Sequence, residues 1–77
     1  MTLSAKATEI LKLLRSTSFE YIEDVDGAEF GVVYLDNAIP QDDATRRSLP
    51  GLLSALTEAG LYLKIDGYAW GAVKIAD

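Results

Sequence analysis

Very few side chains in this sequence could carry out acid–base or nucleophilic chemistry. The 77 residues include no His and no Cys, so the usual general base, the usual zinc ligand and the thiolate nucleophile are all missing. Asp42 and Asp43 are adjacent carboxylates, but acids at this position suit a helix start. The hydroxyls of residues 16–18 have no His or nearby Lys to act as a base. We therefore expect no catalytic residue, no metal site and no cofactor.

A short acidic run, EDVDGAE at residues 23–29, contains the oxygen ligands that calcium prefers. A calcium loop of the helix-loop-helix kind spreads its ligands over about twelve residues between two helices and ends in a bidentate Glu. This run instead lies between two predicted strands. We interpret it as a solvated hairpin tip, which could still face a basic partner.

The net charge of −5 is unevenly distributed along the chain. Residues 19–43 contain all of the excess acid and no base: Glu20, Glu23, Asp24, Asp26, Glu29, Asp36, Asp42 and Asp43. An anionic partner is therefore disfavoured near the middle of the chain and permitted near its ends. Residues 1–18 contain no uncharged run long enough for a signal peptide or a membrane span. We expect a soluble, cytoplasmic protein.

The first element is an amphipathic helix over residues 3–14. Its apolar residues fall at helical spacing: Leu3, Ala7, Ile10, Leu11 and Leu14. Thr2 or Ser4 can cap its start. A hairpin around Asp26-Gly27 follows. A strict two-residue turn would set Asp24 opposite Glu29, so we expect a looser turn or a bulge.

A second helical region contains an apparent break. Ser48 followed by Pro50 resembles a cap with proline in the first turn of a new helix, so the pattern predicts helices over residues 41–47 and 49–59. The second helix would bury four leucines, namely Leu49, Leu52, Leu53 and Leu56. Gly60 should end it in a left-handed conformation, with Leu61 making the accompanying apolar contact.

A second hairpin is predicted around Asp66-Gly67. A two-residue turn would pair Ile65 with Tyr68, Leu63 with Trp70, and Leu61 with Ala72 on one face. We expect this face to form the core, with Trp70 as its anchor, and residues 30–35 to form a third strand beside it. On the other face, the Tyr62 ring can cover the side chain that Gly71 lacks.

The two Asp-Gly hairpins resemble each other. DGAEFGVVYLD at residues 26–36 returns forty residues later as DGYAWGAVKIAD at residues 66–77. The repeat has two explanations: a duplicated unit, or a common hairpin solution that arose twice. The second copy is flanked by Lys64, Tyr68 and Trp70 rather than by acids, so an anionic partner should meet the second hairpin.

The stretch RRSLPGLLSALTEAGLYLKIDGYAWGAVKI, residues 46–75, resembles a winged helix-turn-helix domain. The resemblance implies one α+β domain over residues 1–77, in the order helix, hairpin, short helix, helix, hairpin, with a small antiparallel sheet and one extra strand. It also implies DNA contacts near the helix start, on the helix face and near the wing: Arg46, Arg47, Ser48, Ser54, Thr57, Lys64, Tyr68 and Lys74.

Two functional hypotheses follow. The exposed helix face has none of the side chains that most often recognise bases, and Arg46 and Arg47 could instead be solvated or paired with Asp42 and Asp43. We therefore expect a regulatory or accessory protein that contacts DNA weakly or as a dimer. The alternative is a protein-interaction module that uses its acidic hairpin or a face of small residues, which could also support a homodimer: Pro50, Gly51, Ser54 and Ala55.

Overall fold

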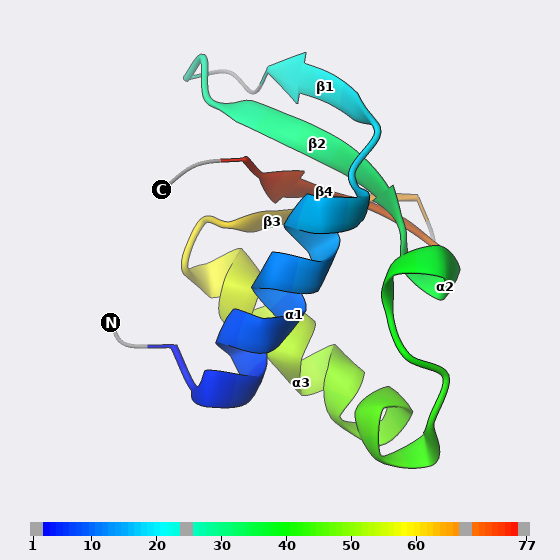
Figure 1. The fold of residues 1–77 in the computed structure, drawn as a ribbon. Coiled ribbons are helices and arrows are strands. Elements are labelled where there is room, and N and C mark those ends of the chain that lie inside the picture. The colour runs from blue at the N-terminus through cyan, green and yellow to red at the C-terminus, as the bar shows by residue number, and fades with distance from the viewer. Residues whose placement is uncertain (1–2, 24–25, 67–68, 76–77) are drawn as a thin grey trace.

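The computed structural model describes residues 3–23, 26–66 and 69–75. Its elements are α1 (Ala5–Thr17), β1 (Glu20–Glu23), β2 (Glu29–Tyr34), α2 (Leu35–Ala38), α3 (Asp43–Glu58), β3 (Tyr62–Asp66) and β4 (Trp70–Lys74). The predicted α+β class and the order helix, hairpin, short helix, helix, hairpin are confirmed (Figure 1).

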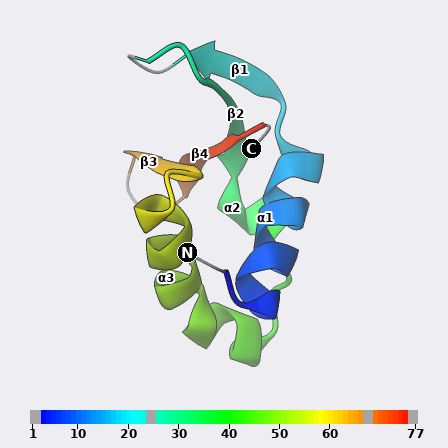
Figure 2. The ribbon, with the colours of Figure 1, turned by 90° about the vertical axis from the view of Figure 1, so that its left-hand side faces the viewer.

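The four strands form one antiparallel sheet in the order β1-β2-β4-β3. Helices α1 and α3 pack against each other and lie on one side of this sheet, while α2 lies at the end of β2 (Figures 1 and 2). Within the described residues, the opposite side of the sheet has no helix over it. The domain therefore has two layers, one of helices and one of strands.

The core lies between these two layers. Its buried residues come from all three helices and from the three strands β2, β3 and β4: Ala7, Ile10, Leu11, Leu14, Val33, Leu35, Ala38, Ile39, Leu56, Tyr62 and Val73. The helix spacing predicted for α1 is confirmed, because its four core residues are the ones on the predicted apolar face. Ser4 caps this helix, since its Oγ accepts a hydrogen bond from the backbone N–H of Ala7 at 3.1 Å.

Helix α3 is continuous, so the predicted break before Pro50 was wrong. Asp42 caps the helix and Pro50 lies inside it. A proline in a helix interior removes one backbone hydrogen bond and typically costs about 3 kcal/mol. The leucines of α3 pack against the core on both sides of Pro50, which holds the helix together across it. The short helix of the fold is α2 rather than residues 41–47.

The end of α3 follows the predicted pattern. Gly60 has a φ of 76°, in the left-handed region that glycine adopts without a steric cost. The N–H of Leu61 donates to the carbonyl of Leu56 at 2.9 Å, and the N–H of Gly60 donates to the carbonyl of Thr57 at 3.0 Å. Leu61 packs against the core. These bonds form a Schellman motif, which turns the chain directly into β3.

The predicted core face of the second hairpin was wrong. Leu63 pairs with Ala72, and these two residues share a face with Trp70, but that face points away from the helices. Trp70 is 37% exposed and is not a core anchor, whereas Tyr62 on the other face is 3% exposed. Leu61 belongs to the helix-ending turn, so the strand alternation begins at Tyr62.

The register of this hairpin also differs from the prediction. Lys64 pairs with Gly71 and Asp66 pairs with Trp70, so Ile65 forms a bulge between them. Tyr68, predicted to pair with Ile65, lies outside the described residues. The predicted covering of Gly71 is confirmed: the hydroxyl end of the Tyr62 ring occupies the place that a Cβ at Gly71 would take.

The first hairpin has the looser connection that was expected. Its pairing ends at Glu23 and Glu29, with five residues between them. Strand β2 then pairs with β4, which confirms the third strand beside the second hairpin, although Leu35 already belongs to α2.

The pairing of the two central strands repeats under a shift of forty residues. The register contains the pairs Gly31–Val73, Val32–Ala72 and Val33–Gly71. Adding forty to the first residue number and subtracting forty from the second converts the pair Gly31–Val73 into the pair Gly71–Val33, which is also present. The same operation converts Val32–Ala72 into itself. The sequence repeat therefore coincides with a pseudo-twofold arrangement of β2 and β4.

Candidate functional site

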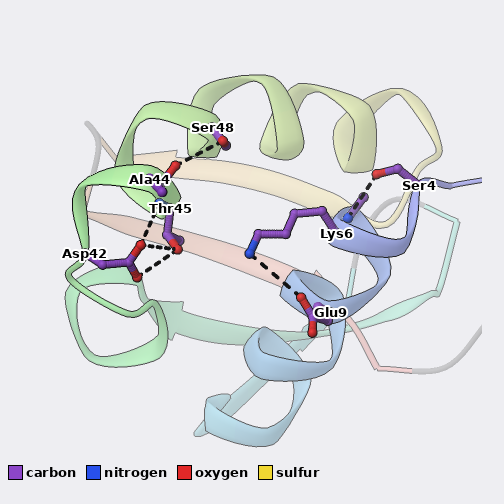
Figure 3. A network of polar contacts seen from close by, with 8 residues as sticks. Ser4, Lys6, Glu9, Asp42, Ala44, Thr45 and Ser48 are labelled. Atoms are coloured by element: carbon purple, nitrogen blue, oxygen red, sulfur yellow. Dashed lines mark hydrogen bonds and ion pairs between the residues drawn. The ribbon is translucent and has the colours of Figure 1, made fainter.

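Arg46 and Arg47 are exposed on the N-terminal half of α3. Within the described part of the chain, neither forms an ion pair with Asp42 or Asp43, which was one of the two alternatives to DNA contact. The Asp42 carboxylate is instead engaged by Thr45, whose N–H donates to it at 2.9 Å and whose hydroxyl donates at 2.9 and 3.0 Å (Figure 3). The backbone bond first, then the hydroxyl bond, holds the pKa of Asp42 below its ordinary value of 3.8.

Ser48 does not begin a new helix. Its hydroxyl donates to the carbonyl of Ala44 at 3.0 Å, one turn earlier in the same helix (Figure 3). The same view shows the exposed ion pair between Lys6 and Glu9, at 3.9 Å on α1. Ser48 is therefore an ordinary exposed residue of α3 rather than a cap.

Three predicted DNA contacts meet in one groove between α3 and β3. The groove has a volume of about 290 Å³ and is lined by Leu35, Leu49, Pro50, Leu53, Ser54, Thr57, Tyr62 and Lys64. The Thr57 hydroxyl donates to the carbonyl of Leu53 at 2.8 Å, so its proton is already used. Apart from Ser54, Thr57, Tyr62 and Lys64, the wall is apolar.

Lys64 and Lys74 do not form one surface. Lys64 pairs with Gly71 and Lys74 pairs with Phe30. Gly71 and Lys74 are three positions apart on the same strand, so they lie on opposite faces of the sheet. The lysine at residue 74 is on the helix-free face, while Lys64 lines the groove on the helix side. Tyr68, the remaining wing candidate, lies outside the described residues.

The candidate interface of small residues lies along the outer side of α3. Pro50, Gly51 and Ser54 are exposed, whereas Ala55 is half-buried. A Cβ placed on Gly51 would meet no atom within 4 Å. The surface expected for a homodimer is therefore open over three of its four residues, and the homodimer itself stays a prediction.

The sequence reasoning missed the helix-free face of the sheet. Four large apolar side chains are exposed there, a set that we name the sheet-face patch: Phe19, Ile22, Leu63 and Trp70. The Trp70 ring contacts Tyr34 at a centroid distance of 4.7 Å and Phe19 edge-on at 5.9 Å. These contacts hold Trp70 in place at the centre of an aromatic cluster.

The sheet-face patch continues into fully covered residues. Phe30 and Ala72 are 2% and 0% exposed, although they lie outside the core between the layers. Neighbouring side chains on the same face must therefore cover them. A signal was present in the sequence: Leu63 and Trp70 alternate with Tyr62 and Gly71, so each face of the hairpin carries apolar side chains beside a single lysine, Lys64 on one face and Lys74 on the other.

Acidic side chains border one end of the sheet-face patch. Glu20 pairs with Val32 and so lies on the helix-free face. Glu23, Asp26 and Glu29 are exposed on the adjoining hairpin. The surface thus combines apolar side chains with an acidic end, and Lys74 lies on the same face beside Phe30.

A scan of protein-family models and searches of curated proteins and solved structures found no match to this chain. Among the residues that the structure describes, none of the helices is both long enough and apolar enough to cross a membrane.

Proposed function

We propose that the chain is a small, non-catalytic interaction module that binds a protein partner through the helix-free face of its sheet. The observation that carries this proposal is the sheet-face patch. Single exposed apolar residues are common on protein surfaces, but several large apolar side chains gathered on one face are typical of a binding site. Tryptophan and other aromatic side chains are also enriched where partners meet.

The partner that fits this surface carries both apolar side chains and positive charge. Its apolar residues would cover Leu63 and Trp70, while its basic residues would meet Glu20 and the acids of the first hairpin. Complementary charge guides encounter and disfavours wrong partners. The acidic hairpin, which the sequence left open as a surface for a basic partner, adjoins the apolar side chains of the sheet-face patch.

The test uses Trp70, because it is the single tryptophan of the chain. A synthetic peptide of alternating Lys and Leu should shift the Trp70 fluorescence emission, and a matched peptide of alternating Glu and Leu should not. Added salt should weaken the complex, because screening reduces the attraction between the basic peptide and the acids.

Two exposed leucines provide matched variants. Leu63 is 37% exposed on the sheet-face patch, and Leu13 is 36% exposed on α1. Leu63→Asp should reduce affinity for the Lys-Leu peptide at least tenfold, which corresponds to about 1.4 kcal/mol, while Leu13→Asp should leave affinity unchanged. An equal change of affinity in the two variants, whether a loss or a gain, would show that the peptide does not bind through the sheet-face patch, and the proposal would fail.

A second candidate function is weak, sequence-independent contact with DNA. It is favoured by Arg46 and Arg47, which are exposed and form no ion pair within the described residues. The order β2, α2, α3, β3, β4 also agrees with a winged-helix-like arrangement that has β1 as an extra strand. The separation of Lys64 from Lys74 limits the expected phosphate contact to the α3 side.

The DNA hypothesis has its own test. Affinity for mixed-sequence duplex at low salt should fall steeply as salt is added, because binding releases counterions. Replacing Arg46 and Arg47 together by Glu should abolish it, whereas Lys74→Glu on the opposite sheet face should not. Absence of association at low salt would exclude this function.

A further inference from the structure

The groove between α3 and β3 has the properties of a small-molecule site. Its volume of about 290 Å³ lies near the lower end of the range for ligand pockets. Leu35, Leu49 and Leu53 supply an apolar wall from two helices, and β3 supplies the opposite wall. Apolar walls with a few placed polar groups are the usual composition of ligand sites.

The polar group that stands out in this groove is the Tyr62 hydroxyl. Tyr62 is 3% exposed, and its hydroxyl forms no hydrogen bond with the described part of the chain. Burial raises the pKa of this hydroxyl above its ordinary value of 10.0, so it stays a neutral donor at physiological pH. A ligand oxygen in the groove could accept a hydrogen bond from this hydroxyl.

The Tyr62 hydroxyl is also accessible from outside the protein. Within the described residues, no side-chain oxygen or nitrogen is both fully enclosed and without a partner. The unpartnered Tyr62 hydroxyl must therefore reach accessible space, although nearly all of its residue is buried. Tyr62 forms part of the groove wall, which makes the groove the place where this opening lies.

Lys64 lines the same groove and carries a positive charge. The hydroxyl end of Tyr62 lies over Gly71, and Lys64 is the residue that pairs with Gly71 across the two strands. Lys64 is also the charged residue among those that line the groove. The sheet side of this apolar groove therefore carries a neutral donor on Tyr62 and a cationic residue, Lys64.

We propose that this groove binds a small apolar monocarboxylate, with its hydrocarbon part between α3 and the sheet and its carboxylate at the Tyr62 hydroxyl and the Lys64 ammonium. A hydroxyl donor and an ammonium group both suit a carboxylate oxygen, and hydrogen bonds to charged groups are stronger than neutral ones. This site is separate from the sheet-face patch and does not depend on it.

Three probes with the same hydrocarbon chain test the proposal: octanoate, 1-octanol and octylammonium. Amide chemical shifts of the full chain, followed by nuclear magnetic resonance, should move around Leu53, Thr57 and Lys64 when octanoate is added. Octanoate should bind at least tenfold more tightly than 1-octanol, and octylammonium should bind most weakly, because only octanoate combines a hydrogen-bond acceptor with a charge opposite to that of Lys64.

Matched variants identify the polar contacts. Lys64→Met should reduce octanoate affinity at least tenfold while leaving 1-octanol affinity unchanged. Lys74→Met removes the same charge from the opposite face of the sheet and should change neither the octanoate affinity nor the 1-octanol affinity. Tyr62→Phe should weaken octanoate severalfold. Should that variant unfold, Ser54→Trp fills the groove from an exposed position and should abolish octanoate binding.

Several results would overturn the proposal. Equal binding of octanoate and octylammonium would mean that the groove recognises only hydrocarbon. Equal loss in Lys64→Met and Lys74→Met would show a general charge effect. Shift changes confined to the sheet-face patch, or none at all, would exclude the groove as the site.

Discussion

Gly71 and Gly51 show how differently a glycine can be used at the scale of single residues. At Gly71, a Cβ would collide with the Tyr62 ring, and both residues are buried. At Gly51, inside α3, a Cβ would meet no atom within 4 Å. One glycine therefore leaves space for another side chain, while the other only weakens a helix.

These two positions predict opposite effects for the same substitution. Gly71→Ala should lower the free energy of unfolding by about 1 to 3 kcal/mol, because the Tyr62 ring must move. Gly51→Ala should raise it by about 0.5 to 1 kcal/mol, because alanine favours a helix. Urea denaturation of both variants measures these changes, and a stabilising Gly71→Ala would contradict the packing described for Tyr62.

Asp42 should make the fold sensitive to acid. Its pKa is lowered in the folded chain, so its ionised cap contributes stability above its ordinary value of 3.8 and loses it as the pH falls through the lowered value. Asp42→Asn keeps a capping side chain without this charge. The stability difference between the wild type and Asp42→Asn should therefore shrink below pH 3.8.

Urea denaturation across the acid range checks the Asp42 prediction. Asp43→Asn removes a neighbouring carboxylate but leaves the Asp42 cap in place, so it should keep the acid-dependent loss. A stability difference between the wild type and Asp42→Asn that does not change with pH would show that ionisation of the cap is unimportant.

Residues with local roles could be predicted from the sequence. The caps at Ser4 and Asp42 and the turn at Gly60 depend on neighbours within a few positions, which the sequence displays directly. Whether Arg46 forms an ion pair could not be predicted, because Arg46 and Thr45 compete for the same Asp42 carboxylate. Thr45 engages the Asp42 carboxylate with two donors, and no ion pair with Arg46 forms within the described residues.

At the scale of elements, Pro50 is the clearest case of tertiary packing overriding a local signal. The Ser-Leu-Pro pattern favours a helix start at Leu49, yet α3 begins six residues earlier at Asp43. The sequence could not reveal this outcome, since the choice depends on how many leucines reach the core if the helix stays intact. The Pro50 ring also leaves the carbonyl of Arg46 without its usual helical donor.

Restoring that donor should stabilise the helix. Pro50→Ala supplies the missing N–H and should raise the free energy of unfolding by about 1 to 3 kcal/mol, as judged by urea denaturation. The new amide should also exchange slowly with solvent deuterium. A fast-exchanging amide together with unchanged stability would mean that α3 is distorted at this position for another reason.

At the scale of the whole molecule, the charge distribution should govern the response to salt. All of the excess acid lies within residues 19–43, and Glu23 pairs directly with Glu29 across the first hairpin. Screening of this repulsion should raise the melting temperature as salt is added.

A charge reversal tests where the repulsion lies. Glu23→Lys turns a like-charge pair into an opposite-charge pair and should stabilise the fold by about 0.2 to 1 kcal/mol at low salt. Glu9→Lys changes the net charge equally but removes the ion pair with Lys6, so it should not stabilise. If both reversals stabilise equally, net charge rather than the hairpin pair is responsible.

The side of the sheet that becomes the core could not be predicted from the sequence. Each face of the second hairpin carries apolar side chains and one lysine, so alternation identified which residues share a face but not which face the helices cover. The bulge at Ile65 and the turn at Leu61 decide that choice. The groove and the sheet-face patch both follow from it, which is why neither was expected.

The pseudo-twofold register of β2 and β4 predicts how the chain should behave when it is cut into two fragments. Each half contributes one long helix and one hairpin, and the halves meet through related edges, as the subunits of a twofold dimer do. The connection between them passes through Pro40 and Gln41, both exposed. Chains cut there would keep complementary edges, so mixing the two fragments should rebuild the sheet, and two uncut chains could exchange halves.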